Sequence, residues 1–530
     1  MIYRQKNCSE TALYAARYRR IESNALRNHR MLRILGSPKR VCGGWTRREM
    51  LQAGALGLFG LGMSDFFRLT DLQAKPSHLM PRSFGRARSC ILLHLYGSPS
   101  QIETFDMKPD APVEIRGELK PVRSSLAGLD VCELLPNLAK VMDRCTVVRS
   151  MTHPYPIHGV AYTLTGVPQI DIPMELNPHD PRHWPFVGSV IAYLAQKNGR
   201  ASLKPVPDNI ALPFRFSSQR VGEVARAGPY AGFLGNAYNP IWTEFHGTAT
   251  HRVVKTLQDQ HLDVRDPYCG ITPESGFELA NGTRLPDEIT LDRLNGRLRL
   301  AEQFDQARRD LDQASAGQSL DHYREMALSL IGSEKIRTAL DLTREPPELR
   351  ASYGMTLFGQ SCLAARRLVE AGTRFITVFW DEYGLAGSGW DTHWDHYPRM
   401  KNELLPGLDR AWAGLIADLD ARGLLEETLV LCVSEHGRTP KMQNVKGGGR
   451  DHWSQAYSSL FAGGGIARGR ILGKTDKIAG SVLDHPVSPK DILATLYHLM
   501  GIDPHTTIRD RTGRPLPLVS DGQVVTNMLA

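Results

Sequence analysis

The feature that most constrains the fold is a series of short, wholly apolar segments spread along the chain. The first, Ser-Cys-Ile-Leu-Leu-His-Leu-Tyr at 89–96, ends in Gly-Ser-Pro-Ser. A short apolar run bounded by turn residues is typical of a strand buried on both faces of a parallel sheet. The segments with this character are 89–96, 145–149, 374–380, 428–434 and 458–462.

Segments with helical periodicity alternate with these strands. They are 134–142, 186–196, 358–371, 404–422 and 489–500, and residues 289–345 predict two further long helices. This alternation predicts an α/β fold with a mainly parallel sheet covered by helices on both faces. Residues 200–290 are rich in Pro, Gly and Asn, so we expect a loop-rich insertion that covers one end of the sheet. The main domain is predicted over 85–515, followed by a tail over 516–530.

The net charge of the chain depends on its first residues. Residues 1–50 hold twelve Lys/Arg and three Asp/Glu, which is +9, whereas the whole chain sums to +8. The remaining residues therefore carry −1 and lack the excess of positive charge that is typical of nucleic-acid binders. We expect no nucleic-acid partner. None of the eight cysteines forms a Cys-x-x-Cys pair, so no thiolate zinc site is predicted.

Residues 1–75 are interpreted as a basic leader. Thr-Arg-Arg at 46–48 precedes a moderately apolar, Gly-rich run at 53–63. Paired arginines before such a run predict a twin-arginine signal and export to the periplasm or the extracellular space. The run is shorter than the roughly 20 residues of a membrane-spanning helix, so no transmembrane span is expected apart from an uncleaved leader. A buried Gly-rich turn and helix is the alternative.

Potential metal ligands follow the predicted strand at 374–380. The Gly-rich loop Gly-Trp-Asp-Thr-His-Trp-Asp-His at 389–396 places Asp391 and His393 two positions apart. In an extended loop these two side chains point the same way, and carboxylate and imidazole are ligands of zinc and manganese. The alternative is a solvated polar loop.

Two further loops carry residues of the same kind. Glu435 and His436 leave the strand at 428–434, where a charged group needs a partner. The loop at 447–453 reads Gly-Gly-Gly-Arg-Asp-His-Trp, in which Arg450 is a candidate oxyanion ligand and His452 a candidate metal ligand. The alternative is that Glu435 and His436 only form a salt-bridged loop with Arg438. Consecutive strand ends meet at one edge of a parallel sheet, so we expect a shared site there.

The N-terminal part supplies other candidates. Ser98 and Ser100 follow the first strand, where a hydroxyl nucleophile would be expected, although a simple turn is also consistent. His153 and His158 flank a Pro-rich loop, and either is a candidate for contact with substrate or an ordinary surface histidine.

These motifs together resemble a large family of exported bacterial proteins catalogued as domain of unknown function fifteen-hundred-and-one. The resemblance covers most of 46–510 and rests on the following motifs: the Thr-Arg-Arg leader, Gly-Ser-Pro-Ser-Gln at 97–101, Thr-Phe-Asp-Met-Lys-Pro-Asp at 104–110, Gly-Trp-Asp-Thr-His at 389–393, the strand-end motif at 434–440, Gly-Arg-Asp-His-Trp at 449–453 and Gly-Gly-Gly at 463–465. The family is similar to the alkaline phosphatase and sulfatase superfamily.

That resemblance implies a three-layer α/β/α sandwich that hydrolyses phosphate or sulfate esters at one or two divalent metals. It implies Asp391 and His393 as ligands of one metal, Glu435 and His436 as the metal-binding pair, and His452 as a late ligand. The chain departs from the superfamily at the end of its first strand, where it has His94 and no Asp. It also lacks a Cys/Ser-x-Pro-x-Arg nucleophile motif.

The leading hypothesis is an exported, metal-dependent hydrolase of sulfate or phosphate esters. A divalent zinc, calcium or manganese ion would polarise the ester, Ser98, Ser100 or water would attack, and Arg438 or Arg450 would hold the anion. The expected partners are an anionic ester substrate, with a sulfated polysaccharide as one candidate, and the twin-arginine export machinery. The alternative is a non-catalytic protein of the same fold that binds anionic glycans or serves the cell envelope.

Overall fold

The computed structural model describes residues 81–155, 159–167, 172–198, 206–221, 226–257, 260–280, 334–385 and 387–530. All of them lie in the compact unit Pro81–Ala530. The leader and its twin-arginine motif, and most of the segment predicted as two long helices, lie outside the described residues. No helix in the described ranges is both long and apolar enough to cross a bilayer.

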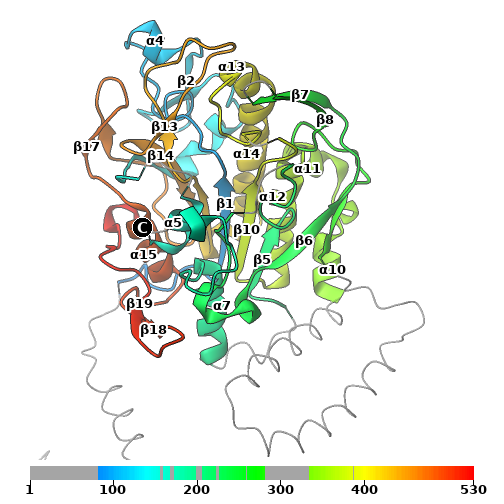
Figure 1. The fold of residues 1–530 in the computed structure, drawn as a ribbon, viewed down its shortest axis with the longest axis vertical. Helices are drawn as coiled ribbons and strands as arrows, with labels where there is room; N and C mark the ends of the chain where they lie inside the picture. The colour runs from blue at the N-terminus through cyan, green and yellow to red at the C-terminus, as the bar shows by residue number, and fades with distance from the viewer. Residues whose placement is uncertain are drawn as a thin grey trace, which may run out of the picture. The chain divides into compact units, whose positions relative to one another are not determined.

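A nine-stranded sheet is the centre of the described fold (Figure 1). Its strands, in spatial order, are β15 (Arg470–Leu472), β4 (Cys145–Met151), β14 (Tyr457–Ala462), β11 (Thr428–Val433), β1 (Ser89–Leu95), β10 (Phe375–Trp380), β5 (Asn209–Leu212), β6 (Ile241–His246) and β9 (Gly276–Leu279). Strand β14 runs antiparallel to both neighbours and β9 antiparallel to β6, while the other pairings are parallel. The prediction of a mainly parallel sheet is confirmed.

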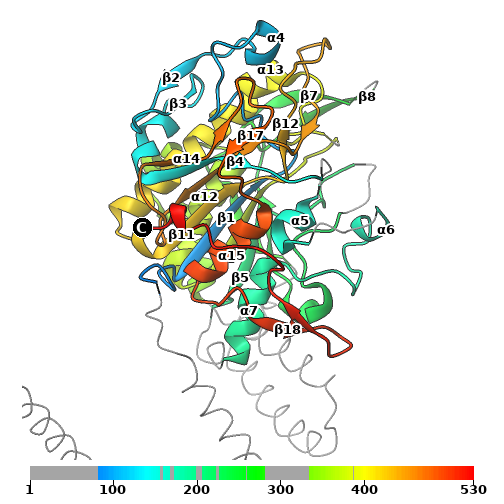
Figure 2. The same ribbon diagram turned by 90° about the vertical axis from the view of Figure 1, so that its left-hand side faces the viewer.

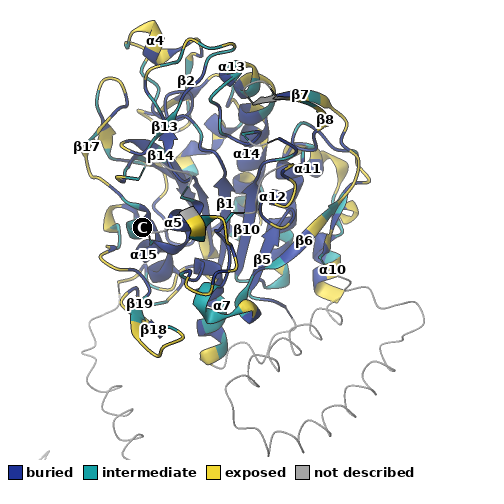
Figure 3. Cartoon of the chain, viewed as in Figure 1, coloured by how far each residue is buried: buried dark blue, intermediate teal, exposed yellow. Residues whose placement is uncertain are grey.

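The three central strands are apolar because both of their faces are covered. Every residue of β1, β10 and β11 is buried, and Figure 3 shows these strands in dark blue. In β1, Ile91 and Leu93 belong to one hydrophobic cluster and Leu92 to the other. Successive side chains of a strand point to opposite faces, so the two clusters fill the two sides of the sheet.

Helices provide the outer layers (Figure 2). The first cluster contains buried residues of α10 (Glu334–Leu340), α12 (Leu357–Ala371) and α14 (Leu405–Ala421). The second contains residues of α5 (Val160–Thr165), α7 (Val187–Lys197) and α15 (Pro489–Leu499). The arrangement is therefore a three-layer α/β/α sandwich, as expected.

The expectation for residues 200–290 needs correction. Strands β5, β6 and β9 come from this segment and extend the central sheet itself, beyond β10. A separate hairpin, β7 (Arg252–Leu257) with β8 (Gln260–Arg265), projects from the same segment. Strands β5 and β9 have only four residues each. Such short strands are hard to recognise in a segment rich in Pro, Gly and Asn.

The C-terminal segment also has regular structure. β19 (Pro515–Pro517) pairs with β18 (Thr507–Arg509), and a short 3-10 helix at Thr526–Met528 follows. Met528 is fully buried in the second cluster, so this tail contributes to the core.

The site is positioned by the carboxyl ends of β1, β10 and β11, which face the same edge because the three strands are parallel. Three loops leave this edge: the one after Leu95, the one after Trp380 and the one after Val433. They contain the motifs that the sequence analysis singled out.

Candidate metal centre

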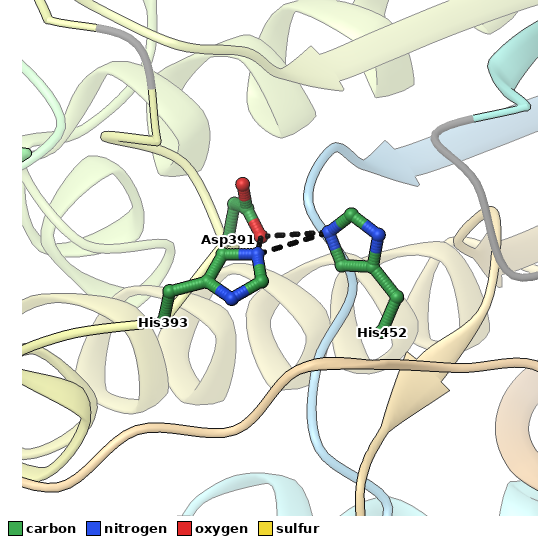
Figure 4. Close-up of side chains that lie close together, drawn as sticks. All are labelled: Asp391, His393 and His452. Carbon is green, nitrogen blue, oxygen red and sulfur yellow. Dashed lines mark hydrogen bonds and ion pairs between the residues drawn. The ribbon is translucent and has the colours of Figure 1, made fainter. Parts of the chain in front are cut away.

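Three side chains from two loops meet above the sheet edge (Figure 4). Asp391 Oδ1 lies 3.0 Å from His393 Nε2 and 3.3 Å from His452 Nε2. The two histidine nitrogens are 3.1 Å apart. All three side chains are partly exposed. Three lone-pair-bearing atoms this close repel one another unless a proton or a cation lies among them.

The spacing of these atoms fits a small cation. Zinc ligands lie about 2.0–2.2 Å from the ion, so adjacent corners of a tetrahedron are about 3.3–3.6 Å apart. The observed separations of 3.0, 3.1 and 3.3 Å lie at or slightly below the lower end of this range. A carboxylate oxygen and two imidazole nitrogens are also the donors that zinc and manganese accept. The residues therefore fit a divalent metal.

Asp451 holds His393 from behind. Its Oδ1 lies 2.7 Å from His393 Nδ1. Because a carboxylate only accepts, Nδ1 donates, and the lone pair of Nε2 is directed toward Asp391 and His452. Gln443 donates its side-chain amide to Asp451 Oδ2. A carboxylate behind a histidine is the usual outer contact of a metal-binding imidazole. Asp451 lies inside the Gly-Arg-Asp-His-Trp motif, but no signal in the sequence identifies it as a functional residue.

His436 and Glu435 lie beside this group. The His436 ring centroid is 4.5 Å from that of His452, and its Nδ1 lies 2.8 Å from the carbonyl oxygen of Gly437. That carbonyl can only accept, so Nδ1 donates and the Nε2 lone pair points away from it. Glu435 is buried and its Oε1 accepts the Gly97 amide at 2.7 Å. The three distant motifs thus converge at one place.

Gly97 allows the first loop to approach the second closely. Its φ is +94°, and a Cβ placed there would lie 2.2 Å from the Asp391 amide nitrogen. Only glycine adopts this conformation without strain or overlap. The backbone after β1 therefore lies directly against Asp391 and links Glu435 to the loop that carries the candidate ligands.

Arg438 is an internal tie between the loops. Its guanidinium is fully buried and lies 2.5 Å from Asp391 Oδ1. It also donates to the carbonyl oxygens of Gly97, Ser98 and Arg450. Its donors are directed at protein oxygens in all three loops.

Arg450 belongs to a second buried cluster. It is fully buried and donates to Glu103 Oε1 from Nη2 at 2.5 Å and from Nε at 3.1 Å. His396 contacts two residues of this cluster. Its Nε2 lies 3.5 Å from Glu103 Oε2, and the other ring nitrogen of His396, Nδ1, lies 2.7 Å from Thr392 Oγ1. Burial alone would raise the pKa of Glu103, but Arg450 and His396 lower it to about 2. Glu103, which no sequence signal identified, therefore joins the loops that carry Thr392 and Arg450.

The two candidate nucleophiles are buried. Ser98 has a φ of +72°, and its Oγ accepts the His436 amide at 3.1 Å. Ser100 is 1% exposed, and its Oγ has no hydrogen-bond partner among the described residues. Neither hydroxyl reaches solvent in this conformation.

The remaining histidines differ in position. His158 lies outside the described residues. His153 Nε2 lies 2.7 Å from the Glu435 carbonyl oxygen, and its Nδ1 accepts the Tyr155 amide. Burial lowers the pKa of His153, so the neutral ring supports the backbone at Glu435. His94 is fully buried at the end of β1, where burial also lowers its pKa.

Several solved structures resemble the chain at low identity. The sulfatase PsFucS1 from Pseudoalteromonas sp. is 12% identical; the similarity covers 91% of this chain and 76% of the sulfatase chain, with a TM-score of 0.36. The phosphonate monoester hydrolase SpPMH from Silicibacter pomeroyi is 11% identical over 83% and 76%, with a TM-score of 0.30. The lipoteichoic acid synthase LtaP from Listeria monocytogenes is 10% identical over 86% and 80%, with a TM-score of 0.33. The strand order of the chain itself defines its fold.

No curated protein matches the chain. One family, described as Protein of unknown function (DUF1501), matches residues 87–529. This range includes the motifs after β1, β10 and β11. The chain therefore belongs to this family, as its combination of motifs predicted.

Proposed function

We propose that the chain is a hydrolase of phosphate or sulfate esters that depends on a divalent metal. One observation carries this proposal: Asp391 Oδ1, His393 Nε2 and His452 Nε2 converge to within 3.3 Å of one another at the carboxyl edge of the sheet. Ligands bind at this edge in parallel α/β sheets. His436 and Glu435 lie beside them and are the candidates for further ligands.

The donor set favours zinc or manganese over calcium. Calcium binds six to eight oxygen ligands, whereas this site presents the nitrogens of His393, His436 and His452. Imidazole suits zinc and other transition metals. Of the three metals that the sequence left open, we therefore propose zinc or manganese.

The chemistry divides between the ion and the chain. When bound, a divalent ion supplies Lewis acidity toward the ester oxygen and toward water. Asp451 keeps the proton on His393 Nδ1, and Arg438 fixes Asp391. Ser98 and Ser100 are buried, so we propose water as the attacking group in place of either serine.

The test is metal analysis of the purified protein together with hydrolysis of aryl phosphate and aryl sulfate esters. We expect bound zinc or manganese and release of the aryl alcohol. His436→Ala should lose metal and turnover, whereas His505→Ala, on the exposed surface, should retain both. Absence of metal and turnover would exclude the hydrolase, and unchanged metal content in His436→Ala would exclude that ligand.

A non-catalytic protein that binds anionic glycans is the second candidate. Two observations favour this second candidate. Ser98 and Ser100 are buried, so neither is available as a nucleophile. Arg438 and Arg450 are paired with Asp391 and Glu103, so neither is available to bind an anion. This candidate predicts glycan binding without release of sulfate or phosphate. The turnover assay separates the two functions.

We further propose that the chain is exported by the twin-arginine machinery. The support is Arg47-Arg48 followed by the short apolar run. Replacement of both arginines by lysine should leave the protein in the cytoplasm, as cell fractionation would show. Export of the double variant at the native level would contradict this route.

A further inference from the structure

A cavity lies against β6 and the loops at the carboxyl ends of β5 and β10. It has a volume of 580 Å³ and is lined by residues of β6 and of the segments after β5, β6 and β10, together with Pro267 and Ala280. These three strands are parallel to β1, so their carboxyl ends face the same way (Figure 1). The chain after β10 supplies Tyr383 to this cavity and continues to Asp391 of the candidate metal centre.

The wall of this cavity is firmly attached to the segment that leads to the metal centre. The Ser217 amide donates to Asp381 Oδ2 at 2.6 Å. Arg220 Nε lies 2.7 Å from Glu382 Oε2, and both side chains are 2% exposed. Val221 donates to the Gly384 carbonyl oxygen at 2.7 Å. Asp381 and Glu382 thus fix the 213–221 loop to the segment that continues to Asp391.

The lining has the chemistry of a site for a polar ring. Phe214, Phe245 and Tyr383 offer apolar faces, and the last two are only partly buried. Gln219, Arg215 and Glu244 are exposed at the rim and include a neutral amide, a cation and a carboxylate. Pockets of this kind combine apolar surface with a few groups that fix orientation. The opposite charges balance, which disfavours a polyanion as the ligand of this cavity alone.

We propose that this cavity binds a sugar ring of a polymeric substrate whose ester group lies at the metal centre. A sugar ring has apolar C–H faces for aromatic side chains and hydroxyls that donate to a carboxylate or amide and accept from a guanidinium or amide. This inference rests on the proposed function and extends it to a substrate class.

The test measures the binding of oligosaccharides of different length by calorimetry, with the purified protein and again after metal removal. The probes are sulfated galactan, cello- and chito-oligosaccharides, each as a disaccharide and a hexasaccharide. We expect at least one hexasaccharide to bind about tenfold more tightly than its disaccharide. Equal affinity for both lengths in every series would overturn the proposal.

Two variants test whether this cavity is responsible for the gain in affinity from disaccharide to hexasaccharide. Tyr383→Ala and Gln219→Ala should each remove most of the tenfold gain and leave disaccharide affinity and aryl ester turnover unchanged. The matched controls are Tyr193→Ala, also partly buried, and Gln523→Ala, also exposed; both should keep the gain. A gain that survives in both cavity variants would refute the assignment.

The outcomes also separate this inference from the proposed function. Length-dependent binding without turnover would exclude the hydrolase and retain the sugar cavity. Turnover of aryl esters without length-dependent binding would retain the hydrolase and exclude the cavity. A protein that binds only amphipathic peptides there would likewise contradict the sugar ligand.

Discussion

Replacement of Glu103 by Gln tests the buried cluster that Glu103 forms with Arg450 and His396. Glu103 and Arg450 are both fully buried, and their closest atoms are 2.5 Å apart. Removing one charge of a buried pair costs about 3–5 kcal/mol because the other charge is left without its counter-ion. Arg450 still donates to the carbonyl oxygens of Thr439, Pro440 and Ile115. We therefore expect a loss near the lower limit, about 3 kcal/mol.

The pKa of Glu103 gives a second route to the same magnitude. A fall from 4.5 to about 2, at about 1.4 kcal/mol per unit, corresponds to roughly 3 kcal/mol. Because the pKa is lower in the folded state, this stability is present above pH 4.5 and is lost as the pH falls toward 2. The difference between the native protein and Glu103→Gln should therefore shrink below pH 4.5.

Urea unfolding at pH 7, 5 and 3 provides the measurement. Glu118→Gln is the matched control, because Glu118 pairs with Lys401 at 2.7 Å but both side chains are exposed. Its loss should stay below about 1 kcal/mol. If Glu103→Gln lost less than the control at pH 7, or if its deficit grew toward pH 3, the assignment of a buried ion pair would be wrong.

Three other predictions address the loops around the site. Asp451→Asn should weaken zinc affinity by about 10- to 100-fold in a chelator competition, because an amide has one acceptor oxygen and cannot accept from both His393 and Gln443; unchanged affinity would argue against His393 as a ligand. Gly97→Ala should lower thermal stability and metal content together, since its Cβ would overlap the Asp391 backbone, and a fully stable, metal-replete variant would refute this. Burial raises the pKa of Asp381 to about 7, so native stability should fall as the pH rises from about 4 to 7, a slope that Asp381→Asn should reduce; an equal slope in both would contradict this.

The sequence predicted the central strands well because burial on both faces leaves an unambiguous apolar pattern. The expected strand over 374–380 is observed at Phe375–Trp380, and the one over 428–434 at Thr428–Val433. The expected helix over 358–371 is observed at Leu357–Ala371, where Thr356 caps its first turn and Gly372 ends it. Here local capping and core burial select the same boundaries.

The edge of the sheet was harder to predict. Strand β5 has four residues, Asn209–Leu212, with a proline directly after them. Strand β6 lacks a continuous apolar run, because it contains the exposed polar residues Glu244 and His246. Strand β5 pairs with β10, and β6 pairs with β5 and β9. These strands depend on such pairing for their stability, and the pairing is not visible in local sequence.

The candidate ligands were predictable, whereas their supporting contacts were not. Asp391, His393 and His452 are residue types that suggest metal ligation wherever they cluster after strands. Asp451 and Glu103 are ordinary carboxylates in the sequence, and their roles depend on which side chain each one faces. That information arises only when the loops after β1, β10 and β11 meet, since β1 lies far along the chain from both of its neighbours.

The two arginines show why residue type alone misleads about charge at the site. Arg438 and Arg450 suggested ligands for an anion, yet both are fully buried and directed at Asp391, Glu103 and backbone carbonyls. The charge of Asp391 is paired with that of Arg438, while Glu435 is a further buried carboxylate in the same group of loops. If the proposed function is correct, Arg438 and Arg450 are not available to attract an anionic ester, so we expect a bound divalent cation to supply that attraction. Binding of aryl phosphate should accordingly be lost on chelation and restored by zinc or manganese, whereas binding that persists in the metal-free protein would show that another cationic group does this work.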